Sequence, residues 1–298
     1  MSATSEAPVA FRYAAGQHGF LSQVREGISD LRSRQRLVRY LVQADIKKRG
    51  ADTILGNLWW ILDPILQMFV YVILITIVAR GQGIPDYPLF IFCALLPWKW
   101  FTEVIGTSTS SVMSQGAIIK QIAFPKIVLP FAAANAGIVG FAFGLIPLFG
   151  VMLIYPDRIT PYLLLIPAIA VVQHLFTLSL AFVLAAGNVF FRDLGNVTQH
   201  VLRLWWFLSP GLYSLALLDH IKFFQDHPAL LTLVNLNPFA VLFTAYRTVV
   251  YGSNDPPAPP GMPDWTSLGI LAVISLGLIV IGIYVFKRLE PDFAKVLG

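Results

Sequence analysis

Long apolar runs separated by short polar segments dominate the chain. The run from Ile159 to Phe191 is typical, because its 33 residues include no Asp, Glu, Lys or Arg. About 20 consecutive apolar residues are enough for a helix to cross a bilayer. The pattern therefore predicts an all-α polytopic membrane protein with six transmembrane helices. The predicted spans cover residues 58–79, 88–105, 127–155, 160–187, 197–217 and 265–286.

Proline is expected to bend or break the first and the fifth of these spans. Asp63-Pro64 falls in the first turns of the first span, where proline removes an intrahelical hydrogen bond, so we expect a kink or a preceding surface helix. Asp63 lies close to the predicted membrane interface, which favours a role at the helix terminus over that of a functional acid inside the membrane. Ser209-Pro210-Gly211 falls late in the fifth span and should break or bend it.

A re-entrant helix pair is predicted between the fifth and sixth spans, over about residues 219–250. The uncharged run Pro228–Tyr246 has 19 residues, which is long enough to span, but Asn235, Asn237 and Pro238 place a turn inside it. We therefore expect two short helices that enter the membrane and return to the same side. Such half-helices are stable only against protein or a water-filled cavity.

The N-terminal part of the chain differs from the rest. Residues 1–19 are polar and are expected to form a disordered tail, and residues 58–298 form the membrane domain. Between them, residues 20–57 show apolar positions at helical spacing, and nine Arg and Lys residues lie within residues 12–49. This pattern predicts an amphipathic helix on the cytoplasmic membrane surface. A solvated helix that only contributes positive charge beside the membrane is the alternative.

Composition and charge agree with a membrane protein. Only 12% of the residues are charged, about half of the usual share for soluble domains, and 56% are hydrophobic. The net charge of +5 does not indicate nucleic-acid binding, because the basic residues cluster beside the spans. With six spans, sixteen of the 21 Lys and Arg residues fall on one side of the membrane, four on the other and Lys99 within a span. We therefore expect both termini in the cytoplasm.

The sequence lacks the motifs of several enzyme classes. It contains no GxxxxGKS/T phosphate loop, no HExxH and a single cysteine, Cys93, so neither nucleotide nor metal binding is predicted and no cofactor is expected in this chain. Few acids lie inside the spans, which argues against a proton or sodium relay. A membrane enzyme acting on a lipid-linked sugar is an alternative, and it would use the outer-face acids, Asp86 and Asp157. The favoured hypothesis is a passive pathway whose energy comes from elsewhere.

A polar island between two spans is the first candidate functional site. It runs from Asn188 to Pro210 and includes Arg192 and Asp193. We interpret this charged turn between two spanning helices as a site that another protein contacts and displaces. The alternative is that Arg192 only anchors the helix end. A second polar connection holds residues 112–124, VMSQGAIIKQIAF, whose spacing predicts one short amphipathic helix.

Charged and aromatic side chains inside the membrane form the second group of candidates. Lys99 and Glu103 are four residues apart, so they can pair on one helix face, which should point at protein or water rather than at lipid. Most aromatic residues near the spans are expected to form interfacial belts. A minority can line an internal path and offer flat apolar faces to sugar rings. These candidates are Trp60, Tyr71, Trp98, Trp100, Phe101, Trp205, Trp206 and Tyr213.

Seven segments give the chain a resemblance to a known family. It resembles the permease subunit of type-2 ABC exporters, in the branch that exports O-antigen, teichoic acid, capsule or galactan chains on a lipid carrier. The match covers nearly everything from Leu37 to Leu297. Each segment alone is weakly specific, but seven in the right order are specific. They are RYLVQADIKKRGADTILGNLWWILDPILQMFVY, LLPWKWF, IIKQIAFPKIVLP, AAGNVFFRDLGNV, WWFLSPGLYSL, LNPFAVLFTAYRTVVYG and VFKRLEPDFAKVL.

The resemblance implies partners for the chain. Two copies of it would form a homodimer with two copies of a separate ATPase, which would hold the ATP and Mg. The polar island would be the coupling elbow that the ATPase engages, and the short helix after span two would be a second contact. The residues implied in these contacts are Gln115, Lys120, Arg192, Asp193, Leu194 and Gly195.

The same resemblance implies a route for the substrate. A lipid-linked polysaccharide would enter near the amphipathic helix on the cytoplasmic side of a bacterial plasma (inner) membrane. It would be threaded stepwise between two protomers, along spans one, two and five. A drug or small-glycolipid exporter of the same fold is the alternative within the family. The re-entrant pair would cap the external mouth, with the gate residues Asn237, Pro238, Tyr246 and Arg247.

Overall fold

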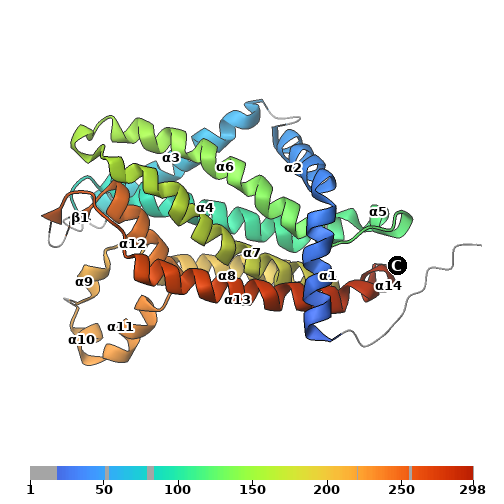
Figure 1. The fold of residues 1–298 in the computed structure, drawn as a ribbon. Coiled ribbons are helices and arrows are strands. Elements are labelled where there is room, and N and C mark those ends of the chain that lie inside the picture. The colour runs from blue at the N-terminus through green and yellow to red at the C-terminus, as the bar shows by residue number, and fades with distance from the viewer. Residues whose placement is uncertain (1–18, 51–53, 79–83, 220, 255–256, 298) are drawn as a thin grey trace, which may run out of the picture.

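The computed structural model of the 298-residue chain describes residues 19–50, 54–78, 84–219, 221–254 and 257–297. This part of the chain is a bundle of long helices that lie side by side, with shorter helices gathered at its two ends (Figure 1). The expected disordered tail, apart from its last residue, lies outside the described residues.

The helices and strands are, in chain order, α1 (Phe20–Ser33), α2 (Gln35–Gly50), α3 (Trp59–Ile73), α4 (Tyr87–Ser111), α5 (Gly116–Gln121), α6 (Val128–Met152), α7 (Ile166–Phe190), α8 (Leu194–Leu208), α9 (Leu215–Asp219), α10 (Lys222–Asp226), α11 (Pro228–Asn235), α12 (Pro238–Val250), β1 (Ser253–Asn254), β2 (Pro257–Ala258), α13 (Trp265–Leu289) and α14 (Phe293–Val296). Short 3-10 turns cover Gly56–Leu58, Met113–Gln115, Pro156–Arg158, Pro161–Leu165 and Glu290–Asp292, and a π-helical turn covers Leu74–Val78. Proline lies in the first turn of α4, α7, α11 and α12. The N–H groups of a first turn have no intrahelical acceptor, so proline, which lacks an N–H, costs no hydrogen bond there.

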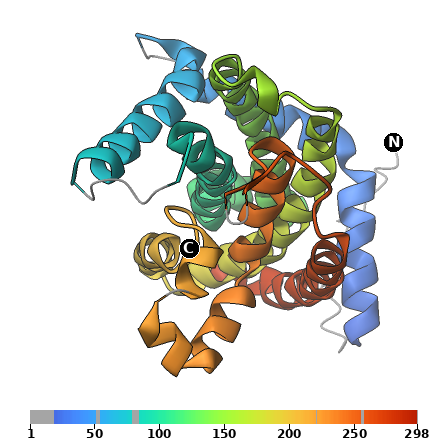
Figure 2. The same cartoon turned by 90° about the vertical axis from the view of Figure 1, so that its left-hand side faces the viewer.

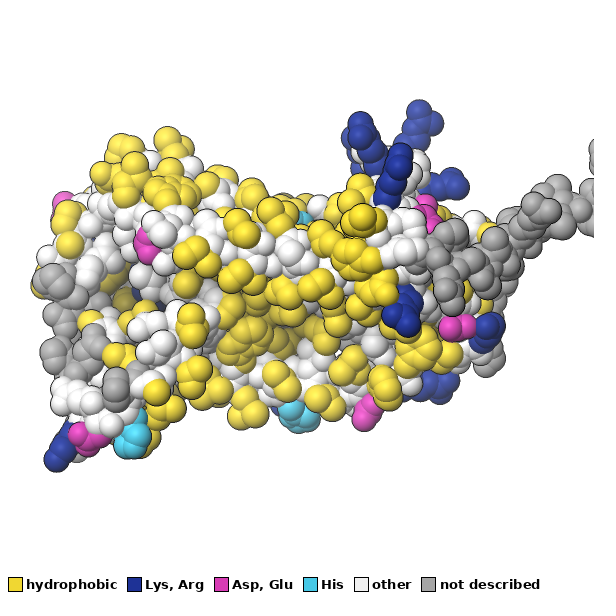
Figure 3. All heavy atoms as spheres, turned by 60° about the horizontal axis from the view of Figure 1, so that its bottom comes forward, with side chains coloured by type: hydrophobic (Ala, Val, Ile, Leu, Met, Phe, Trp, Pro, Cys, Tyr) yellow, Lys and Arg dark blue, Asp and Glu magenta, His cyan; other side chains and the backbone are white. Residues whose placement is uncertain are grey.

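Within the described residues, five helical segments are long and apolar enough to cross a membrane. The number is six if the bent pair of α11 and α12 counts as one span. A band of hydrophobic side chains covers the middle of the molecule, and the charged side chains lie mostly toward its ends (Figure 3). The prediction of an all-α polytopic membrane protein is therefore confirmed. The five segments overlap predicted spans one to four and six, and they are Trp59–Ile77, Tyr87–Ser111, Val128–Met152, Pro161–Phe190 and Trp265–Val296.

The predicted fifth span is shorter than expected. It begins with α8, which has 15 residues and ends at Leu208. The backbone leaves the helix at Ser209, and Pro210 and Gly211 follow, so the break that these residues predict occurs and divides the span. A helix of this length is about 22 Å long, whereas the hydrocarbon core is about 30 Å thick. α8 therefore reaches only part of the way across.

The bent helix pair predicted between the last two spans is present. α11 and α12 meet at an angle of 63° across Leu236 and Asn237. The Asn237 side chain caps α12 by accepting a hydrogen bond from the backbone N–H of Phe239, which explains why the turn falls there. α12 enters the bundle and is largely buried, while α9, α10 and α11 lie at one end of the molecule (Figure 1).

The N-terminal region contains two helices rather than the single amphipathic helix expected over residues 20–57. The break at Arg34 lets α1 cross the end of α13 while α2 packs on α6 (Figure 1). α1 comes unusually close to α13 at Gly27, where a larger side chain would overlap Ile283 and Lys287. These contacts show that one face of each helix binds the bundle, which periodicity alone could not reveal.

The core is built around α4. In the most apolar 18-residue stretch of α4, 78% of the residues are buried. The corresponding share for the span that begins with α3 is 17%. α4 packs against α3, α6, α7, α8 and α12. Viewed from the end that carries α9–α11, α4 lies near the centre and α3 stands at the edge (Figure 2). One spanning helix, α3, is therefore covered on only a small part of its surface by the rest of the chain.

Candidate functional site

An ion pair joins α3 to α4 in the membrane-spanning part. Lys99 Nζ lies 2.9 Å from Asp63 Oδ2, and 53% of the Asp63 side chain and 28% of the Lys99 side chain are exposed. Lys99 thus has a partner on the neighbouring helix. Its predicted pairing with Glu103 on the same helix stays a prediction. Asp63 was expected to act at the end of α3, but the packing of α3 on α4 brings it to the Lys99 amine. Charges exposed at this depth require water or protein beside them.

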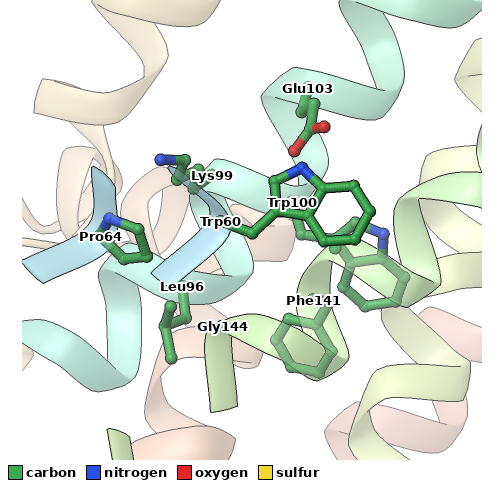
Figure 4. Close-up of a pocket in the computed structure, with 9 residues that line it drawn as sticks. Trp60, Pro64, Leu96, Lys99, Trp100, Glu103, Phe141 and Gly144 are labelled. Carbon is green, nitrogen blue, oxygen red and sulfur yellow. The ribbon is translucent and has the colours of Figure 1, made fainter. Parts of the chain in front are cut away.

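A small pocket adjoins the ion pair, between α3, α4 and α6. Figure 4 shows the carboxylate of Glu103 and the indole rings of Trp60 and Trp100 together beside it. The indole N–H of Trp100 is buried and has no hydrogen-bond partner in the described part of the chain. The pocket volume is about 30 Å³, which is enough for ordered water but too small for a sugar ring. Lys99 and Glu103 therefore line one small polar site.

Half of the aromatic residues predicted to line a path are buried in the core. The ring of Trp98 lies 4.7 Å from that of Phe239 and 5.4 Å from that of Trp206, measured between centroids. Trp98, Trp100, Phe101 and Trp206 are buried within this one chain, so packing accounts for them. The partly exposed members, which can face a path, are Trp60, Tyr71, Trp205 and Tyr213.

Asn237 connects the broken end of α8 to the start of α12. Its Nδ2 donates to Ser209 Oγ over 2.8 Å, and its Oδ1 accepts from Trp205 Nε1 over 3.1 Å. The same Oδ1 caps α12 at Phe239, and Pro238 occupies the first position of that helix. A single amide side chain thus satisfies polar groups of both helices. This arrangement fixes the angle at which α12 leaves the turn.

Arg247 makes the second connection between these helices. Its guanidinium is buried and donates to the carbonyl oxygens of Pro210 and Gly211, over 2.6 Å and 2.5 Å. A longer bond reaches the Tyr213 carbonyl, and the charge stacks 3.6 Å above the centre of the Phe90 ring. Hydrogen bonds from a charged donor are stronger than neutral ones, so these carbonyl oxygens stabilise the buried cation. Arg247 thus supplies hydrogen-bond donors to backbone carbonyl groups in the break after α8.

The predicted gate residues therefore share one element but make different contacts. Tyr246 is buried in the core, with its ring 6.1 Å from that of Phe141. Asn237 and Arg247 hold the two ends of α12 against the break after α8. We call these two residues, with their hydrogen-bond partners, the α8–α12 lock. The lock makes the position of α12 depend on the conformation of the segment that follows α8.

The predicted elbow is an exposed turn held by a buried asparagine. Arg192 and Asp193 lie between α7 and α8 and are exposed. Asn188, near the end of α7, donates to the Thr109 carbonyl over 3.0 Å and accepts from the backbone N–H of Gly195 over 3.0 Å. It thereby ties the elbow to the end of α4. Sequence reasoning used Asn188 only to mark the start of the polar island; the signal for its role is an amide at the end of a long uncharged run.

A second exposed element lies at the same end of the bundle. Gln115 ends the 3-10 turn that precedes α5, and Lys120 lies within α5. Apolar side chains are exposed on both elements: Phe191 in the elbow is 67% exposed, and Ile122, just after α5, is 58% exposed. Leu194 and Gly195 begin α8 and are partly buried. An exposed apolar side chain thus adjoins the exposed charges of Arg192 and Asp193.

Comparison with known proteins identifies the chain. A sequence model described as ABC-2 type transporter matches residues 36–251, well over half of the chain. The chain belongs to this family. An O-antigen export system permease protein RfbA of Myxococcus xanthus is 34% identical over 255 residues, which are 86% of this chain and 93% of that protein. Two proteins of the same name from Klebsiella pneumoniae are 27% and 28% identical, each over 88% of this chain and 95% of its own length.

An ABC-2 permease is a membrane component of a transporter rather than an enzyme, and an ABC ATPase is its implied partner. Of the two acids that the membrane-enzyme alternative would use, Asp86 forms an ion pair. Asp86 Oδ2 lies 3.2 Å from one guanidinium nitrogen of Arg158. Another nitrogen of the same guanidinium donates to the Tyr251 carbonyl. Asp86 therefore holds the turn before α4 against the end of α12, while Asp157 is exposed in its 3-10 turn. In the described residues, no three His, Cys, Asp or Glu side chains are grouped to hold a metal ion.

Proposed function

We propose that this chain is the membrane subunit of an ATP-driven exporter of lipid-linked polysaccharide. Its cargo is of the O-antigen, galactan or teichoic acid type, and it moves from the cytoplasmic to the outer side of a bacterial plasma membrane. The observation that carries the proposal is the likeness to the Myxococcus xanthus O-antigen permease, which extends over 86% of this chain and 93% of that protein. The family match from residue 36 to residue 251 includes the elbow, the break after α8 and the bent pair.

The elbow and α5 are the proposed contacts for a separate ATPase. Arg192 and Asp193 offer exposed charges, and Phe191 and Ile122 offer exposed apolar surface. Both elements lie at the same end of the bundle as α1 and α14. Lys and Arg side chains gather at that end of the molecule (Figure 3). Because positive charge is retained on the cytoplasmic side of membranes, this end and both termini are proposed to face the cytoplasm, where ATP is available.

The cargo path is proposed to run between two copies of the chain. α3 is only slightly covered by its own chain, and the ion pair of Asp63 and Lys99 is partly exposed beside it. Lipid disfavours such charges, so a second protomer or water must cover them. A homodimer that places α3, α4 and α8 of each copy around a shared path satisfies this requirement. Trp60, Tyr71 and Trp205 would then offer partly exposed rings to passing sugars.

The α8–α12 lock is proposed to close the external mouth of this path. The lock lies toward the end of the bundle that carries α9–α11, opposite the elbow (Figure 1). A polymer is longer than any closed cavity, so export requires a mouth that opens around the chain and closes between steps. α8 connects the elbow at one end with the lock at the other. A displacement of the elbow therefore reaches the mouth through a single helix.

Co-purification tests the proposal. The tagged chain would be purified in mild detergent from its native cells, and the accompanying proteins identified. We expect a stoichiometric soluble ATPase with a phosphate-binding loop. A second arm deletes the gene and measures polysaccharide on each side of the plasma membrane, where we expect lipid-linked polymer to accumulate inside. A chain that purifies alone, from cells whose deletion strain still displays its polysaccharide, would overturn the proposal.

A further inference from the structure

The segment Glu290–Leu297 contacts α5 and the end of α7 that leads into the elbow. It continues from α13 through a 3-10 turn into α14. α14 contacts α5 and also α7, whose end carries the elbow. Figure 1 shows α14 at the same end of the bundle as α5. The segment is thus placed to link two loops that are far apart in the sequence.

Buried charges fix the start of this segment. Glu290 is 6% exposed. Its Oε1 accepts the backbone N–H of Lys126, where the connection from α5 enters α6, over 2.5 Å, and its Oε2 lies 2.8 Å from Lys287 Nζ. The same amine contacts Glu26 and Asp30 of α1, over 2.8 Å and 2.9 Å. A buried charge held by several partners resists displacement, because moving it would leave a charge unpaired. The segment is therefore anchored to α1, α6 and α13.

Apolar packing fixes the middle of the segment. Phe293 is fully buried, and its ring lies 5.2 Å from that of Phe286 on α13 and 6.0 Å from that of Phe190. Phe190 is the last residue of α7, next to the exposed elbow. Close-packed side chains transmit displacement because they leave little free volume. A displacement of Phe190 would therefore be transmitted to Phe293.

The end of the segment lies on α5. Leu297 Cδ2 is 4.0 Å from the position that a Cβ would take at Gly116, the first residue of α5. Val296 and Leu297 are partly buried against the main core. Lys295 and Asp292, in contrast, are paired on the exposed side of the segment. One face of α14 therefore packs on the bundle, and the other is exposed.

We propose that Glu290–Leu297 is a strut that makes α5 and the elbow respond to the ATPase as one body. Without this segment, α5 and the elbow would move independently when the ATPase displaces them, because they lead into separate helices. Packing through Phe293 on one side and Leu297 on the other gives them a common support. Glu290 and Phe293 are then positioning residues, since they act through the elbow and α5 and touch neither cargo nor nucleotide. The inference rests on the proposed function.

The test separates energy coupling from assembly. Phe293→Ala should still insert and bind the ATPase, and ATP hydrolysis should continue, while export falls about fivefold or more, the usual scale of a lost coupling between sites. Phe293→Leu, which keeps most of the volume, should retain export. Lys295→Ala changes an exposed residue of the same helix and serves as the matched control. Equal losses of ATPase binding and export in Phe293→Ala would overturn the strut, because they indicate a general folding defect.

A cross-link between α5 and α14 provides a second test, which leaves the packing of Phe293 intact. Cysteines replacing Gly116 and Leu297 would be joined by a short bismaleimide, and the single native thiol, Cys93, is buried in α4 and serves as background control. The strut predicts that export persists after cross-linking, because α5 and α14 move together. Export that stops on cross-linking would show that they must separate, and would overturn the inference. Failure of the proposed function itself is recognised separately, by an unaltered chain that binds no ATPase.

Discussion

Replacement of Arg247 by methionine tests whether the α8–α12 lock stabilises the fold around the break after α8. The guanidinium is buried and is held by backbone carbonyls, with hydrogen bonds of 2.6 Å to Pro210 and 2.5 Å to Gly211. Methionine has similar length and fills most of the space, so the change removes the donors and the charge with little loss of packing. Both carbonyl groups then lose their shortest hydrogen bonds while they stay away from water.

The expected loss follows from these two bonds. A hydrogen bond that involves a charged group contributes about 1.5–3 kcal/mol, so two contribute about 3–6 kcal/mol. Removing a buried charge returns part of this, because its desolvation is no longer needed. We expect a net loss of about 3 kcal/mol, which corresponds to a fall in apparent Tm of about 6–12 °C. The longer bond to Tyr213 adds little.

Thermal unfolding of the purified complex in detergent, followed by tryptophan fluorescence, measures this fall. Arg203→Met on the exposed side of α8 is the matched control, and it should leave the apparent Tm unchanged. Arg247→Lys should give an intermediate value, because a single ammonium group cannot reach all the carbonyls that the planar guanidinium reaches. An Arg247→Met complex whose apparent Tm stays within about 2 °C of the unaltered complex would refute the reasoning, since it would mean that the carbonyls find other donors.

Three further predictions concern other parts of the molecule. Reversing the charges of Arg192 and Asp193 should abolish export while the chain still inserts, and surface polysaccharide at the normal level in that variant would contradict the elbow as an ATPase contact. Asp63→Asn should lower stability by about 1 kcal/mol or less if water covers the pair with Lys99, whereas a loss near 3 kcal/mol would indicate a dry environment, either lipid or a second protomer. Alanine at both outer-face acids should leave export intact, and loss of export with an assembled complex would argue for chemistry at the outer face.

Local sequence signals predicted most of the helical architecture. Uncharged runs located the long helices because an apolar segment of sufficient length has one stable state in a bilayer. Ser209-Pro210-Gly211 predicted the break after α8, and the turn at Asn237 predicted the bent pair, because both are properties of a few consecutive residues. The family resemblance, carried by seven short segments in order, agrees with the family match.

The contacts between distant segments could not be predicted in this way. Periodicity shows that Lys99 lies on a face of α4, but only the packing of α3 decides that Asp63 meets it. The partners of Arg247 are backbone carbonyls, which leave no trace in side-chain composition. The break at Arg34 is set by the surfaces of α6 and α13 on which the two N-terminal helices pack. Side chains expected on a path, such as Trp98, are in the core for the same reason.

The short length of α8 has a consequence for the surrounding lipid. Hydrophobic surfaces shorter than the hydrocarbon layer draw the bilayer thinner around them, at a modest cost for each ångström of mismatch. α8 covers about 22 Å, some 8 Å less than the typical layer, and the chain beyond Leu208 turns back as short helices. The lipid beside α8 must therefore thin, or yield its place to water. On the proposed function, either response shortens the distance over which a hydrophilic polymer would be exposed to hydrocarbon.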